Sequence, residues 1–260
     1  MVSQLESTTK ADIIYPDSDG KPMSDNTKQF RWITVIYYNL EWLFANESDV
    51  FVAGDLLWYP VEGSNNIRIG PDVMVVFGAP KGDRGSYMQW KEGNIPPQVV
   101  FEILSPGNTQ TEMNKKLVFY ERYGVEEYYL YDPDKNDFSG WVRSSERFDV
   151  IDPVHNWVSP RLKIRFDLSG NELSIYRPNG EPFTGYLEIS RRLEEVLQRA
   201  QQAEQRAEEE RQRAEEERQR AEEERQRAEE ERQRAEEERQ RAERLAHRLR
   251  ELGIDPDGVD

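Results

Sequence analysis

Residues 98–106 read QVVFEILSP, an apolar run that carries a single charged residue, Glu102. A short apolar run that ends in turn residues is typical of a strand buried on both faces of a sheet. A charged side chain in such a strand is costly unless it is paired or ligates a cation. We therefore expect residues 98–104 to form a central strand in which Glu102 has either an ion-pair partner or a chemical task.

A second apolar strand is expected at residues 73–77 (VMVVF), directly after Pro71 and Asp72. If the two strands are neighbours, the carboxylates of Asp72 and Glu102 converge at one edge of the sheet. Two simpler interpretations stay open at this stage. Pro71 and Asp72 are also typical of a plain turn, and Glu102 is equally able to pair with an arginine.

A helix is expected over residues 111–123, closed by Gly124 at a position that favours the left-handed conformation. Its buried stripe follows from the spacing of three residues, Met113, Leu117 and Tyr120. This places the solvent side of the helix about half a turn away from the stripe.

Two adjacent lysines of this helix differ in direction. Lys116 lies roughly 60° from Met113, at the border of the buried stripe, whereas Lys115 points roughly 160° away. Lys116 is therefore the lysine that faces the sheet, and Glu112, four positions earlier, is placed to orient it. The alternative is that Lys116 only extends its methylenes along the apolar edge.

The other elements indicate an α/β fold with a mixed central sheet flanked by helices. An amphipathic helix begins at Ser24 or Asp25, and the segment 78–97 is expected to be a long loop. Further strands are expected at residues 50–59, 66–69, 127–131, 140–142, 148–151, 162–166 and 173–176.

From residue 191 the sequence becomes a heptad repeat, with the unit AEEERQR beginning five times between Ala207 and Ala235. Alanine at a and glutamate at d make a weak seam, and arginine at both e and g disfavours pairing of two copies. Leucines occur only toward the two ends of this segment. We expect a long C-terminal α-helix, either solvated on its own or in a weak coiled coil, that extends about 90 Å as a spacer or assembly arm.

These patterns divide the chain into four parts. They are a flexible N-terminal lead-in (residues 1–23), an α/β domain (residues 24–190), a charged heptad-repeat helix (residues 191–252) and a disordered C-terminus (residues 253–260).

The composition excludes several kinds of site. The chain has no cysteine and only two histidines, so thiolate nucleophiles, Cys-ligated metals and a multi-His metal site are excluded or improbable. The net charge of −10 on residues 1–190 disfavours broad electrostatic attachment to nucleic acid unless bound cations or a local basic strip compensate. Without an apolar run of about 20 residues or a signal pattern, a cytoplasmic protein that does not enter the membrane is expected.

Three blocks in order resemble the Uma-two family of predicted restriction endonucleases, which is especially numerous in cyanobacteria and belongs to the PD-(D/E)XK nuclease superfamily. The blocks are Pro71-Asp72-Val73, then VVFEILSP (residues 99–106), then Asn114-Lys115-Lys116 followed by Tyr120 and Gly124. The resemblance covers about residues 24–180 and leaves out the repeat. It implies a restriction-endonuclease-like core with a divalent-cation site.

The resemblance also implies roles for individual residues. Asp72 corresponds to the metal-binding aspartate, Glu102 to the second acid and Lys116 to the lysine of the pattern. The pattern has lysine two positions after the acid, where this chain has Leu104, and the family is similar in supplying it from the following helix. Many members have aspartate where this chain has Glu112.

Hydrolysis of a phosphodiester requires cations that neutralise phosphate and activate water, and oxygen ligands suit Mg²⁺ or Mn²⁺. The expected ligands are Asp72, Glu102 and the backbone carbonyl of Ile103, with Lys116 stabilising charge. DNA is the expected substrate, and RNA is a lesser alternative. A different hypothesis is a weak or inactive nuclease-like domain that acts as a scaffold, with homo-oligomers formed through the tail or the core.

Overall fold

The computed structural model describes residues 13–20 and 22–253. It divides into two compact units, with the boundary along the chain between residues 189 and 190. Most of the expected flexible lead-in (residues 1–23) and almost all of the expected disordered C-terminus (residues 253–260) lie outside the described residues.

The N-terminal unit is built on one mixed sheet of six strands in the order β1-β3-β5-β6-β7-β8. β5 and β6 are parallel, and the other neighbouring pairs are antiparallel. The strands are Val50–Gly54 (β1), Val73–Phe77 (β3), Val99–Ile103 (β5), Glu127–Asp132 (β6), Asp137–Ser144 (β7) and Arg147–Val150 (β8). A parallel pair needs a crossover connection, which α2 (Gln110–Arg122) supplies. The predicted α/β class with a mixed central sheet is confirmed.

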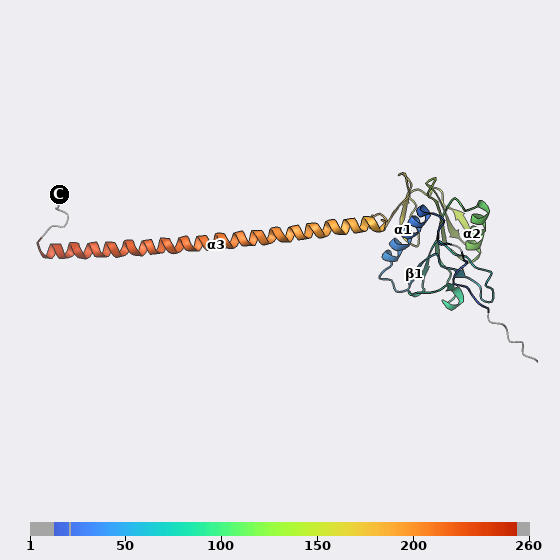
Figure 1. Ribbon diagram of the computed structural model, residues 1–260, viewed down its shortest axis with the longest axis horizontal. Coiled ribbons are helices and arrows are strands. Elements are labelled where there is room, and N and C mark those ends of the chain that lie inside the picture. Colours follow the sequence, from blue (N-terminus) through green and yellow to red (C-terminus); the bar gives the residue numbers. More distant parts are fainter. Residues whose placement is uncertain (1–12, 21, 254–260) are drawn as a thin grey trace, which may run out of the picture. The chain divides into compact units, whose positions relative to one another are not determined.

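Each face of the sheet packs against a different helix. Figure 1 shows α1 (Thr27–Leu43) and α2 apart from one another, with strands of the sheet between them. Side chains alternate along each strand, so odd-numbered residues of β3 and β5 join the core with α1 and even-numbered ones join the core with α2. By this alternation, Asp72 and Glu102 belong to the α2 face of the sheet.

The start of α1 differs from the expected cap at Ser24 or Asp25. Asn26 is the N-cap, because its backbone is extended and its side chain accepts a hydrogen bond from Gln29 N at 2.9 Å. The carboxylate of Asp25 is engaged elsewhere, by the hydroxyl of Ser105 at 2.5 Å. This contact ties the start of α1 to the turn that follows β5.

The segment 78–97 is mostly loop, as expected, but it includes two short elements. It contains β4 (Tyr87–Met88), which pairs in parallel with β2 (Trp58–Tyr59), and a 3₁₀ turn, η1 (Gln89–Lys91). The strand expected at residues 66–69 is reduced to one bridge between Ile69 and Trp58. The last short strands are β9 (Arg165–Asp167) and β10 (Ser174–Tyr176), which pair with each other.

The second unit is formed by α3 (Tyr186–Glu251), a continuous helix of 66 residues. None of its residues is buried, and its charged side chains form ion pairs along the helix, such as Glu195 with Arg199 and Arg239 with Glu243. The predicted long C-terminal helix is confirmed. Among the residues that the structure describes, no helix has the length and apolarity needed to cross a membrane.

Candidate active site

Asp72 and Glu102 meet because β3 and β5 are neighbours. Their antiparallel register pairs Val73 with Phe101, and one step further along the same register Asp72 stands opposite Glu102. Asp72 Oδ2 accepts a hydrogen bond from the backbone N–H of Ile103 at 2.6 Å, which fixes the aspartate beside β5. Both carboxylates are buried, with 9% and 2% of their residue surface exposed. The convergence predicted for neighbouring strands is confirmed.

Lys116 reaches the same point from α2. The helix is capped at its start by Thr109, whose side chain accepts a hydrogen bond from Glu112 N. Tyr123 is its C-cap, followed by Gly124, which has a φ of +92°. Lys116 Nζ lies 2.6 Å from Glu102 Oε2, and only 17% of the lysine side chain is exposed. Of the two adjacent lysines, the one selected by the helical wheel is therefore the one that faces the sheet.

The charges of this cluster influence one another strongly. Burial, together with the charge of Glu102, raises the pKa of Asp72 well above its usual range. Burial alone would lower the pKa of Lys116, but the carboxylates of Glu102 and Asp72 outweigh it and raise that pKa above its usual value. Lys116 therefore remains a cation near neutral pH, suited to stabilising negative charge rather than to accepting a proton.

Tyr120 is a member of the cluster that the sequence reasoning did not assign to the site. Its hydroxyl donates a hydrogen bond to Glu102 Oε1, so Glu102 has one donor on each oxygen. The sequence did contain a signal, since Tyr120 stands four residues after Lys116 on the same stripe of the helix. The helical spacing by itself indicates only packing for that residue.

Asp55 is a second residue that the sequence reasoning missed. Its N–H donates to Asp72 O at 3.1 Å, which continues the register of β1 and β3 by one step and places Asp55 beside Asp72. Its φ of +49° is a strained conformation for a residue other than glycine. Burial raises the pKa of Asp55, and the charges of Asp19 and Glu102 raise it further. Three carboxylates thus lie side by side, one just after β1, one just before β3 and one within β5.

The other two residues expected at the site, Ile103 and Glu112, have partners of their own. The carbonyl of Ile103 accepts a hydrogen bond from Gln29 Nε2 at 2.8 Å, so this candidate ligand is held in place by α1. Glu112 was expected to orient Lys116, but its carboxylate accepts a long hydrogen bond, 3.5 Å, from Asn108 Nδ2. The charge of Glu112 still contributes to the raised pKa of Lys116. Its influence on the lysine is thus electrostatic.

The donor set agrees with a hard divalent cation. Mg²⁺ typically takes one or two carboxylates and retains several waters, which Asp72, Glu102 and the Ile103 carbonyl together satisfy. Within residues 13–20 and 22–253, no group of three or more Asp, Glu, His or Cys is arranged to hold a metal ion. Asp55 is a neighbour of the two candidate ligands.

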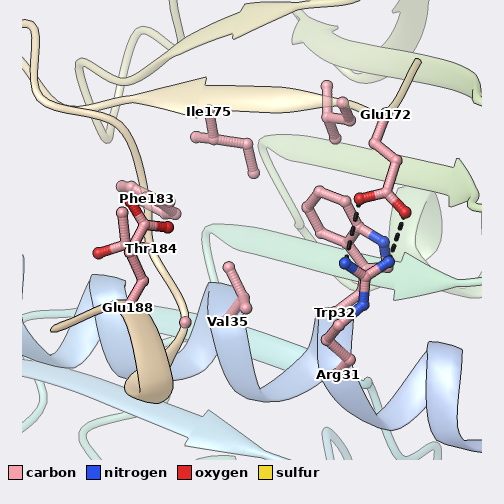
Figure 2. Close-up of a pocket in the computed structure, with 10 residues that line it drawn as sticks. Arg31, Trp32, Val35, Glu172, Ile175, Phe183, Thr184 and Glu188 are labelled. Carbon is pink, nitrogen blue, oxygen red and sulfur yellow. Dashed lines mark hydrogen bonds and ion pairs between the residues drawn. The ribbon is translucent and has the colours of Figure 1, made fainter. Parts of the chain in front are cut away.

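A cavity of about 210 Å³ lies elsewhere, between α1 and the segment 172–188 (Figure 2). Its charged residues include Arg31 and Glu172, which form an ion pair with each other at 2.5 Å. Apolar side chains such as Val35, Ile175 and Phe183 line much of the rest. Because Trp32 and Ile175 belong to the α1 core, this cavity is on the opposite face of the sheet from Glu102.

This chain is similar to a known protein family and to a solved structure. The family described as "Uma2: Putative restriction endonuclease" matches residues 20–179. A structure described as a "putative nuclease belonging to DUF820" from Anabaena variabilis is 19% identical, covers 55% of this chain and 78% of its own, and has a TM-score of 0.41. No curated protein matches the chain.

Proposed function

Since the chain belongs to the Uma2 family, we propose that its N-terminal unit is an endonuclease that uses Mg²⁺ or Mn²⁺ to hydrolyse phosphodiester bonds in DNA in the cytoplasm. The observation that supports this most directly is the meeting of Lys116 with Glu102 at 2.6 Å, beside a second buried carboxylate, Asp72. Two acids and a cationic lysine, gathered where β3 begins and β5 ends, are the groups that phosphodiester hydrolysis requires.

Each residue has a distinct task in this proposal. Asp72 and Glu102 hold the cation, which when bound lowers the pKa of water and offsets phosphate charge. Gln29 of α1 donates a hydrogen bond to the carbonyl of Ile103 and so holds this backbone oxygen, the third candidate ligand, in place. Lys116, kept protonated by its carboxylate neighbours, stabilises the negative charge that develops on the phosphate.

The excess of acidic over basic residues in the domain is compatible with a DNA substrate when a divalent cation is bound. The first 190 residues contain 18 basic and 28 acidic residues, and several of the acids are placed at the site itself. A bound divalent cation supplies the positive charge that the protein lacks there. Binding of DNA is therefore expected to depend on the cation.

Cleavage of a supercoiled plasmid tests the proposal. With Mg²⁺ or Mn²⁺ the full chain is expected to produce nicked and then linear DNA, and with EDTA none, because the carboxylates alone cannot activate water. An RNA of similar length, assayed in parallel, decides between the two substrates. Glu102→Gln, purified identically, controls for contaminating nucleases. No cleavage with any divalent cation, or equal cleavage by Glu102→Gln, would refute the assignment.

A scaffold role is the second candidate, and the surface of α3 favours it. Six large apolar residues toward the ends of the helix are half or more exposed: Tyr186, Leu187, Leu193, Val196, Leu197 and Leu245. Between them the repeat carries ion pairs within one helix rather than an apolar seam. We propose that contacts between copies, where they form, involve these ends.

Removal of the tail separates the two candidates. A chain ending at Ser190 is expected to keep its nicking rate within about threefold, because every residue of the site lies before α3. The scaffold candidate predicts that light scattering finds an oligomer for the full chain and a monomer after truncation. A monomer in both cases contradicts assembly through α3, and loss of nicking after truncation contradicts the assignment of catalysis to the N-terminal unit.

A further inference from the structure

Glu102 is held by two side chains of one helix. Lys116 contacts Oε2 and Tyr120 contacts Oε1, and the two residues are one helical turn apart on α2. Glu102 is 2% exposed and Tyr120 is 0% exposed, so water does not compete for either contact. The direction of the Glu102 carboxylate is therefore set by α2 and not by solvent.

The ring of Tyr120 is itself held rigidly. Trp58 of β2 stacks parallel to it, with ring centres 6.5 Å apart and an interplanar angle of 3°. Tyr128 of β6 packs on it at 5.1 Å. The indole N–H of Trp58 donates to Gln89 Oε1 at 3.1 Å, which fixes the tryptophan in turn. A hydroxyl on a ring so confined has one direction available, toward Glu102.

We propose that Tyr120 is a positioning residue of the active site, which orients the carboxylate of Glu102 so that its Oε2 faces Lys116. This inference rests on the proposed function, because it assigns Tyr120 a role in holding a cation through Glu102. Partners that orient a ligating carboxylate typically contribute 10–100-fold to metal affinity. A purely structural role would instead change only the stability of the fold.

Tyr128 provides a matched control for removing the hydroxyl. It is a buried tyrosine of the same aromatic cluster, and its hydroxyl has no hydrogen-bond partner within the described residues. Tyr120→Phe and Tyr128→Phe therefore delete the same atom from adjacent rings. Only the first deletion removes a hydrogen bond to Glu102.

The experiment measures Mn²⁺ binding by the full chain, from the electron paramagnetic resonance signal of free Mn²⁺. Tyr120→Phe is expected to weaken binding about 10–100-fold, and Tyr128→Phe to stay within about twofold of wild type. The Mg²⁺ concentration that half-activates plasmid nicking is expected to rise by the same factor in Tyr120→Phe, with the rate at saturating Mg²⁺ largely recovered. Thermal unfolding confirms that both variants are folded at the assay temperature.

The outcomes separate this inference from the proposal beneath it. A wild-type protein that binds no Mn²⁺ overturns the proposed function and the role of Tyr120 together. A wild-type Mn²⁺ site with equal affinities in both tyrosine variants overturns the role of Tyr120 alone. A fall in stability of Tyr120→Phe with unchanged Mn²⁺ affinity likewise assigns the hydroxyl to the fold and overturns the inference.

Discussion

Replacing Lys116 by methionine is expected to lower the rate of plasmid nicking by about 10²–10³-fold, the usual cost of one preorganised group that stabilises transition-state charge. Mn²⁺ binding is expected to be as tight as in wild type or tighter, because the lysine no longer offsets the two carboxylates. This opposite behaviour of rate and affinity distinguishes a residue that acts on the phosphate from one that holds the cation. Single-turnover nicking and a Mn²⁺ titration measure the two quantities.

Lys115 is the matched control, since it is the adjacent lysine of the same helix and is exposed. Lys115→Met is expected to change nicking by less than about threefold, as usual for an exposed substitution. Methionine at position 116 leaves a buried carboxylate without its ion-pair partner, so Lys116→Gln is the second variant, because glutamine retains a donor for Glu102. Equal losses in the Lys115 and Lys116 variants would contradict the assignment of Lys116.

The sequence was most informative where one periodicity decided the outcome. The strand 73–77 coincides with β3, and the helical wheel distinguished Lys116 from Lys115 because a single stripe of three apolar residues fixes the angle of every residue on α2. The ends were predicted less exactly, because the helix expected at residues 111–123 is observed at Gln110–Arg122, and the strand expected at residues 98–104 is observed at Val99–Ile103.

The partners of the site could not be predicted in this way. Asp55 lies beside Asp72 because of the register of β1 with β3. Gln29 contacts Ile103 because α1 packs on the sheet. Both contacts join segments far apart in the sequence. Local periodicity carries no information about either. The cap at Asn26 was missed because Asp25, an equally good capping residue, is held by Ser105, 80 positions away.

Replacing Asp72 by asparagine is expected to abolish metal-dependent nicking and yet to stabilise the metal-free protein. Asparagine has nearly the same shape and keeps an oxygen that accepts the N–H of Ile103, but it removes a buried charge that faces Glu102. The gain is expected to be about 1–2 kcal/mol near pH 8, which corresponds to an increase of about 2–8 °C in the midpoint of thermal unfolding. Active-site residues often carry this conflict between stability and function.

The pH dependence of that gain follows from the raised pKa of Asp72. A carboxyl whose pKa is raised by folding binds its proton more tightly in the native state, so its contribution to stability is present at low pH and is lost as the pH rises through the native pKa. Asparagine does not titrate. The difference in unfolding midpoint between Asp72→Asn and wild type, both in EDTA, should therefore be small near pH 4 and grow toward pH 8. Addition of Mg²⁺ should reduce this difference in unfolding midpoint, because it stabilises only the wild type. A wild-type protein more stable than the variant at pH 8 in EDTA would show that Asp72 is not held against the charge of Glu102.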